Sequence, residues 1–215
     1  MDFIYTKKHK TIILLSPILI IIVNILTAVV FGKIIGKWAF IPLILIEWII
    51  FIFFINKYGE KDASRKWLLR SNKNWGWNIL TVLIGVLPIP IFLKYHHLLY
   101  DWTIWLPWIV LALINPWLEE FYWRGLLSDV TKKWNTLLSI LFTSTLFSIN
   151  HVVFGINSDL FRGYEVILST FIMGIVWATT YKKTNSLRWV ILSHFLVDFL
   201  NLSAPAFLDL FSREM

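Results

Sequence analysis

A chain of 215 residues that is 58% hydrophobic and 15% charged, with a mean hydropathy of +0.69, is too apolar to bury its hydrophobic surface in a water-soluble core. The absence of cysteine excludes disulfides, thiolate nucleophiles and thiolate metal sites. The net charge of +7 would suggest nucleic acid in a soluble protein, but here the basic residues lie between apolar runs, where they set membrane topology. We therefore expect a lipid bilayer, and no nucleic acid, as the partner.

Seven apolar runs come close to the roughly 17–25 residues that cross the hydrocarbon core of a bilayer. In chain order they are 11–31, 38–55, 77–93, 102–127, 137–154, 164–181 and 187–202. A last apolar stretch, 204–211, is too short to span and predicts a half-helix or a segment on the lipid surface. The sequence thus predicts an all-α, polytopic transmembrane helix bundle of about seven to eight spans.

The distribution of lysine and arginine predicts the orientation of this bundle. Fourteen of these residues lie at the N-terminus and in alternate loops on one side, whereas five lie on the other side. Short cytoplasmic loops are the richer in basic residues, so we expect a multi-pass protein of the cell membrane with a cytoplasmic N-terminus. Residues 1–100 then form an N-terminal unit of about three spans with a basic cytoplasmic loop at 56–74, and residues 101–215 form a second helical unit.

Charged residues in the fourth run are the first candidates for function, because charges in an apolar span are costly and mark functional sites. Glu120 and Arg124 are four positions apart and can form an ion pair on one helix face. Glu119 points about 100° away and stays free. A free carboxylate between apolar walls suits a general base, although the three residues could also merely tie helices together.

Two later runs carry histidines with polar or aromatic companions. Phe147 and His151 share a helix face in the fifth run, and His194 and Asp198 share one in the seventh, where the carboxylate can orient or charge an imidazole. Glu47 in the second run has no partner at helical spacing, and we assign it no function. The sequence contains no His-Glu-x-x-His zinc signature.

These three motifs, in this order, resemble the CPBP family, which comprises the CAAX-type proteases and the bacteriocin-processing or immunity proteins, also called Abi proteins. The family pattern is Glu-Glu-x-x-x-Arg, then Phe-x-x-x-His, then His-x-x-x-Asn or Asp, and the match covers residues 113–202. The resemblance implies that 101–215 is the catalytic helix core and that the site is made of Glu119, Glu120, Arg124, His151, His194 and Asp198. The third motif ends in Asp198 where the prenyl-protein proteases carry Asn, which adds a negative charge to the site.

The resemblance implies an intramembrane endopeptidase in which Glu119 activates a water that attacks a peptide carbonyl. We expect His151 and His194 to stabilise the oxyanion and Asp198 to hold the tautomer of His194. His151 and His194 with a carboxylate could instead bind zinc, so glutamate and metal mechanisms both stay open. The expected substrate is a membrane-associated or amphipathic peptide, or a membrane protein.

Two other functions and one geometric difficulty accompany this hypothesis. A non-catalytic bacteriocin-immunity or signalling scaffold of the same family has no need for all six polar groups, and a proton-coupled transporter is expected to show repeated halves, which we do not find.

If every helix were straight and perpendicular, His151 would lie deeper than Glu119 and His194. A break at Pro116, or a fifth helix that begins below the membrane surface, would bring them together.

Overall fold

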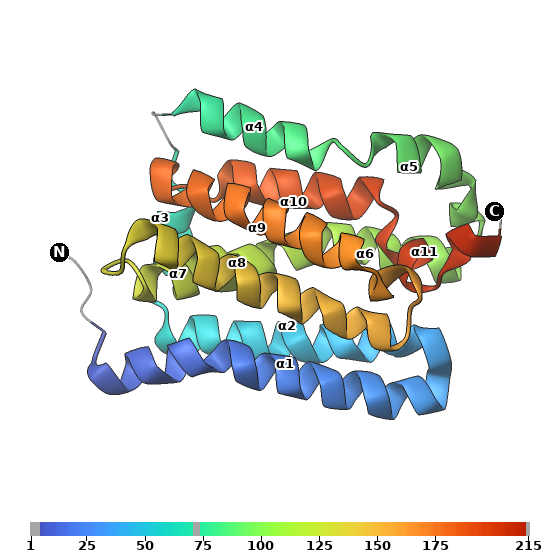
Figure 1. Cartoon of the computed structure of the whole chain (residues 1–215), viewed down its shortest axis with the longest axis horizontal. Helices are drawn as coiled ribbons and strands as arrows, with labels where there is room; N and C mark the ends of the chain where they lie inside the picture. The colour runs from blue at the N-terminus through green and yellow to red at the C-terminus, as the bar shows by residue number, and fades with distance from the viewer. Residues whose placement is uncertain (1–4, 71–73, 214–215) are drawn as a thin grey trace.

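The computed structural model describes residues 5–70 and 74–213 and is helical over these ranges, which confirms the predicted all-α class (Figure 1). The α-helices are, in chain order, α1 (Lys7–Ile35), α2 (Phe40–Tyr58), α3 (Ala63–Trp67), α4 (Trp75–Gly85), α5 (Ile89–Tyr95), α6 (Trp102–Glu120), α7 (Leu127–Val130), α8 (Thr136–Val152), α9 (Tyr164–Thr184), α10 (Arg188–Leu200) and α11 (Ser203–Phe207). Short 3₁₀ or π segments are η1 (Gly36–Ala39), η2 (His96–Tyr100), η3 (Phe121–Leu126), η4 (Val153–Ile156), η5 (Leu160–Arg162) and η6 (Leu210–Arg213).

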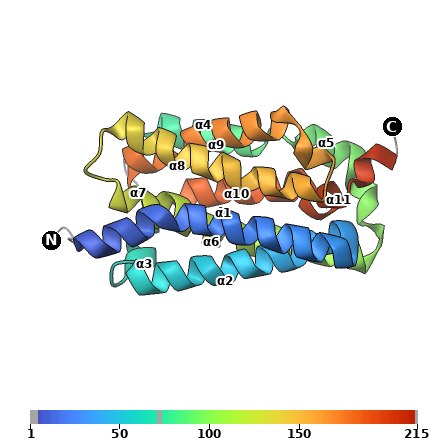
Figure 2. The same ribbon diagram turned by 60° about the horizontal axis from the view of Figure 1, so that its bottom comes forward.

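The first two helices form an antiparallel pair along one side of the bundle (Figure 2). Thr6 caps the start of α1 by accepting a hydrogen bond from the backbone N–H of His9 at 3.2 Å. The helix ends at Gly36, whose φ of 59° is a conformation that glycine adopts without strain. The tight turn at η1 then returns the chain as α2.

The third predicted run is interrupted in the structure. Residues 77–93 were expected as one helix, but α4 ends at Gly85 and α5 begins at Ile89. Pro88 precedes α5 and Pro90 lies in its first turn, where the missing N–H of proline costs no hydrogen bond. The two prolines therefore favour a new helix start at this point over continuation of α4.

The helices that carry the three motifs pack in the middle of the bundle. Helix α10 packs against both α4 and α6, α6 packs against α2, and α8 packs closely against α9 (Figure 1). The close approach of α8 and α9 depends on a small residue: a Cβ at Gly174 would lie 3.0 Å from the Cβ of Ser144. The motif helices α6, α8 and α10 are thereby held between α1 and α2 on one side and α4 and α5 on the other (Figures 1 and 2).

By length and hydropathy, four segments of the described chain qualify as membrane spans: Lys7–Tyr58, Trp75–Tyr100, Thr136–Ile156 and Tyr164–Thr184. The first contains both α1 and α2, so it is a helical pair. The predicted seven to eight spans are not confirmed, since α10 has 13 residues and α6 carries polar site residues. Large apolar side chains on the outside, such as Leu26 and Ile34, are 60% and 69% exposed, as in a membrane protein that faces lipid.

The last predicted segment, 204–211, is a short helix, α11, followed by η6. It packs against α6 at the end of the bundle away from the N-terminus (Figure 1). Asp209 holds it there by accepting hydrogen bonds from Ser158 Oγ at 2.5 Å and from the backbone N–H of Leu160 at 2.9 Å, and by pairing with Lys37 Nζ at 2.6 Å. The C-terminal segment is therefore attached to two loops of this end.

The division into units 1–100 and 101–215 stays a prediction.

Candidate active site

The three motifs converge on one cavity of about 430 Å³ in the middle of the bundle. Its lining includes Glu119 from α6, His151 from the last turn of α8, and His194 and Asp198 from α10. Glu120 and Arg124 are buried behind this lining, with 0% and 1% of their side-chain surface exposed. The structure thus brings all six residues of the sequence hypothesis into one neighbourhood.

The depth of Glu119 follows from the helix that continues beyond it. Helix α6 runs through Pro116 without a break, and η3 and α7 extend the helical path to Val130. Glu119 lies 11 residues before that end, which at a rise of about 1.5 Å per residue is roughly 16 Å from it. The π-helical η3 begins two residues after Glu119, at Phe121, and such wide turns are frequent at functional sites. The proposed break at Pro116 is therefore wrong.

Glu120 is the carboxylate that organises the cationic part of the site. Its Oε1 accepts hydrogen bonds from Arg124 Nη1 at 3.0 Å and from His194 Nδ1 at 2.8 Å. The guanidinium of Arg124 lies 3.9 Å from the ring centroid of Phe147, and the ring of Trp177 stacks on His194 at 4.6 Å. Glu120 therefore accepts hydrogen bonds from two buried donors that come from two helical segments.

Both histidines use Nδ1 in a hydrogen bond within the chain and keep Nε2 for other contacts. His194 uses Nδ1 for Glu120, so Nε2 remains, 3.7 Å from Asp198 Oδ2. This distance is too long for a hydrogen bond, so Glu120 rather than Asp198 fixes the ring. His151 Nδ1 donates to the backbone carbonyl of Phe147 at 2.9 Å. Since a carbonyl only accepts, Nδ1 of His151 carries the proton and Nε2 is left as an acceptor in the neutral ring.

Asn115 is a site residue to which the sequence reasoning gave no role. Its Nδ2 donates to Glu119 Oε1 at 3.0 Å and to Asp198 Oδ2 at 3.3 Å, while its Oδ1 accepts from Trp48 Nε1 at 2.8 Å. The spacing of four residues between Asn115 and Glu119 was the available signal. The other oxygen of Glu119, Oε2, is buried and makes no hydrogen bond within the described chain. One Glu119 oxygen is thus fixed by Asn115, and the other is buried without a hydrogen-bond partner in the described chain.

A second buried glutamate lies behind the site. Glu47 Oε1 accepts from Asn24 Nδ2 at 3.0 Å and from Asn150 Nδ2 at 2.7 Å, and Asn150 precedes His151 in the sequence. Glu47 has no exposed surface and is absent from the residues that line the cavity. The partners that Glu47 lacked at helical spacing come from α1 and α8, so its cluster ties three helices together.

A zinc centre requires at least three protein ligands around the ion. Over residues 5–70 and 74–213, no group of three or more His, Cys, Asp or Glu side chains is arranged to hold a metal ion. The residues present therefore do not fit a three-ligand zinc site.

Comparison with known proteins supports the resemblance. The family model for Rce1-like proteins, described as type II CAAX prenyl endopeptidase Rce1-like, matches residues 101–200, a range that contains every residue of the three motifs. No curated protein and no solved structure matches the chain. Several apolar helices and this match together indicate a membrane protein that is similar to proteases over residues 101–200. The resemblance predicted from the motifs is confirmed: residues 101–200 match the Rce1-like endopeptidases, which is consistent with a protease of the CPBP family.

Proposed function

We propose that this protein is an intramembrane endopeptidase that hydrolyses a peptide bond of a membrane-associated or amphipathic peptide with a water activated by Glu119. The observation that carries the proposal is the asymmetry of the Glu119 carboxylate. Asn115 fixes Oε1, whereas Oε2 has no hydrogen-bond partner in the described chain and belongs to a residue that lines the cavity with both histidines. A general base needs this combination of a fixed position and an oxygen that is not already taken by a hydrogen bond within the chain.

In the first chemical step, the attacking water is held by Glu119 Oε2 and by the acceptor Nε2 of His151. Glu119 takes one proton of the water as its oxygen forms a bond to the carbonyl carbon, and the electron pair of the carbonyl moves to oxygen. His194 in its protonated form donates from Nε2 to this oxyanion, while Glu120 accepts from Nδ1 of the same ring. His194 therefore stabilises the oxyanion and His151 orients the water, a division of work that the sequence hypothesis did not contain.

In the second step, the tetrahedral intermediate returns its electron pair to the carbonyl and the C–N bond breaks. The proton held by Glu119 passes to the departing amine nitrogen, which regenerates the carboxylate. The products are a carboxylic acid and an amine. Asp198 supports the sequence electrostatically, since its carboxylate lies 3.7 Å from His194 Nε2 and stabilises the imidazolium form.

The test is hydrolysis of a library of helical peptides by the purified protein in detergent, followed by mass spectrometry of the fragments. We expect new peptide termini with the wild-type protein, none with Glu119→Gln, and the same fragments in the presence of a zinc chelator. Loss of cleavage in the chelator would contradict the glutamate mechanism. Binding of peptides without cleavage by either protein would instead favour the immunity or signalling scaffold.

A further inference from the structure

The cavity runs from the proposed catalytic residues toward one end of the bundle. Its walls include Phe154 at the end of α8, Phe161 in the following loop, and Phe207 and Phe211 in the C-terminal segment. All these elements lie at the end of the bundle opposite the N-terminus (Figure 1). The apolar part of the cavity is therefore directed away from the N-terminus.

The other end of the site is closed by packed aromatic side chains. Trp123 has no exposed surface, and Trp67 of α3 is 3% exposed and lies over Gly125, where a Cβ would come within 2.8 Å of its ring. Trp67 Nε1 donates to Asp129 Oδ2 at 2.9 Å, and its carbonyl accepts from the backbone N–H of Leu187 at 2.8 Å. These contacts seal the end of the site that faces the N-terminus.

The mouth of the cavity contains exposed side chains of α5, η5 and α9. Ile91 is 37% exposed and Leu160 is 46% exposed, and Glu165 and Ser169 are exposed as well. The cavity therefore reaches the surface beside α9, with one carboxylate at its rim and apolar or aromatic residues along its walls. Its volume of about 430 Å³ lies within the range of roughly 300–1,000 Å³ that ligand pockets occupy.

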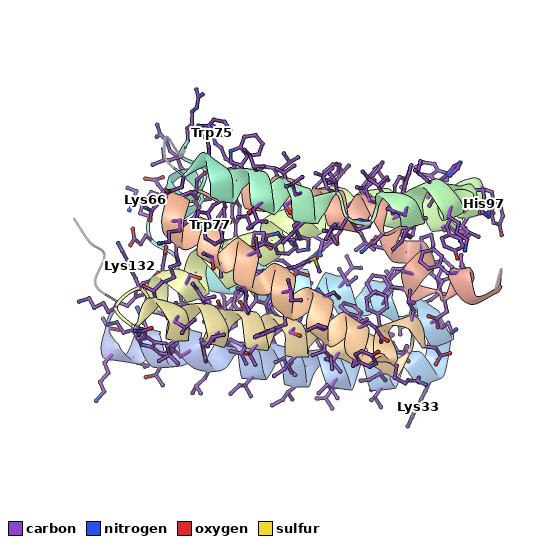
Figure 3. All side chains as sticks on the ribbon, turned by 45° about the horizontal axis from the view of Figure 1, so that its top comes forward. Lys33, Lys66, Trp75, Trp77, His97 and Lys132 are labelled. Atoms are coloured by element: carbon purple, nitrogen blue, oxygen red, sulfur yellow. The ribbon has the colours of Figure 1, made fainter. Side chains whose placement is uncertain are left out.

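The basic residues indicate which end of the bundle faces the cytoplasm. Figure 3 labels Lys66 and Lys132 at the closed end and Lys33 and His97 at the other end. The described elements at the closed end, which include the start of α1, α3 and the end of α9, carry most of the lysine and arginine of the described chain, and short cytoplasmic loops are the basic ones. The open end of the cavity thus corresponds to the non-cytoplasmic face.

We infer that the site takes its peptide from the non-cytoplasmic face, and that its substrate is an exported or outer-leaflet peptide segment with a bulky apolar side chain near the cleaved bond. This inference rests on the proposed function for the chemistry and on cavity geometry for the direction of entry. The aromatic walls bind the apolar side chain, and Glu119 with the two histidines reaches the peptide bond at the inner end. A peptide in the cytoplasm meets the sealed end.

Direction of entry can be measured without knowing the substrate, because the chain has no cysteine. Single variants Ser169→Cys at the mouth and Ser64→Cys in α3 are expressed in cells and treated with a charged, membrane-impermeant methanethiosulfonate. We expect the thiol at position 169 to react in intact cells and the thiol at position 64 to react only after the membrane is opened. Leu168→Cys is the matched control, since Leu168 is 54% exposed, neighbours Ser169 and is absent from the cavity lining.

A thiol in hydrocarbon is not ionised and reacts slowly, so we expect the Ser169→Cys variant to react at least about ten times faster than the Leu168→Cys variant. Equal rates of the two variants, no reaction of Ser169→Cys, or its reaction only after the membrane is opened would each overturn the inference. The two proposals fail separately. If the purified protein cleaves no peptide, labelling still reports the open face. If it cleaves but the thiol at position 169 is reached from the cytoplasm, the catalytic proposal stands and the direction of entry is wrong.

Discussion

Glu47 and Glu119 are two buried glutamates with similar immediate partners and different surroundings. Each uses Oε1 to accept from asparagine amides, and each has an Oε2 without a hydrogen bond in the described chain. Glu119 lines the 430 Å³ cavity, whereas Glu47 does not. Burial and an amide partner are therefore common to both glutamates, and access to the cavity is the feature by which the proposed general base differs from Glu47.

The two glutamates are also connected. Trp48, the neighbour of Glu47, donates to Asn115, which in turn holds Glu119, and Asn150, which donates to Glu47, precedes His151. The Glu47 cluster thus supports the site from behind through α2 and α8. We expect a change at Glu119 to abolish chemistry and a matched change at Glu47 to be tolerated, and the following predictions test that difference.

The largest effect is expected for Glu119→Gln, which keeps the size of the side chain and its acceptor for Asn115 but removes the base. Loss of a general base typically costs about 10²- to 10⁴-fold in rate. We expect peptide cleavage to fall by at least this factor, while the melting temperature in detergent and peptide binding stay close to wild type. A variant that retains cleavage would exclude Glu119 as the base.

Glu120→Gln should fail differently, because Glu120 is the partner of two buried groups. It removes the negative charge opposite Arg124, whose side chain is 1% exposed, and weakens the contact with His194. Breaking a buried ion pair by removing one partner costs about 3–5 kcal/mol. We expect both unfolding stability and activity to fall, measured by thermal unfolding in detergent and by cleavage. Normal stability with lost activity would contradict the supporting role of Glu120.

The sequence predicts best what is local along one helix. The ion pair of Glu120 and Arg124 followed from a spacing of four residues, as did the shared face of His194 and Asp198. The all-α class and the apolar runs followed from composition, because lipid-facing helices are apolar over most of their surface. The prolines at positions 88 and 90 were visible, but hydropathy alone does not register the interruption between α4 and α5.

Contacts between helices could not be predicted from the sequence, because the spacing of residues along one helix does not say which faces of two helices meet. Asp198 seemed the natural partner of His194 at four residues, yet Glu120 from another helix lies 2.8 Å from Nδ1 and Asp198 lies 3.7 Å from Nε2. For the same reason, the hydrogen bond from Trp48 to Asn115 could not be predicted from the sequence. Relative depth was also misjudged, since the helical path continues from α6 through η3 and α7.

Asn115→Ala tests whether Glu119 needs its hydrogen bond to Asn115 in order to act as the base. Asn115 is a positioning residue, since its Nδ2 holds Glu119 and Asp198 together. Misplacement by about 1 Å can cost roughly 10²-fold in rate, so we expect kcat to fall between about ten- and a hundredfold with KM little changed. Trp48→Phe is the control, because it frees Asn115 from α2 but leaves both carboxylate contacts. A loss confined to stability would contradict positioning.

The smallest effect is expected for Glu47→Gln, the counterpart of the change at Glu119. The glutamine side chain can still accept from Asn150, and its new amide can donate to Asn24 Oδ1, which has no hydrogen-bond partner in the described chain. Neutral hydrogen bonds replace the two contacts that Asn24 and Asn150 make with the carboxylate, so we expect stability to change by about 1 kcal/mol or less and cleavage to stay within about twofold of wild type. Thermal unfolding and peptide cleavage should be measured side by side with Glu119→Gln. If Glu47→Gln abolished cleavage with the fold intact, the carboxylate behind the site would take part in the chemistry, and access to the cavity would no longer separate the two glutamates.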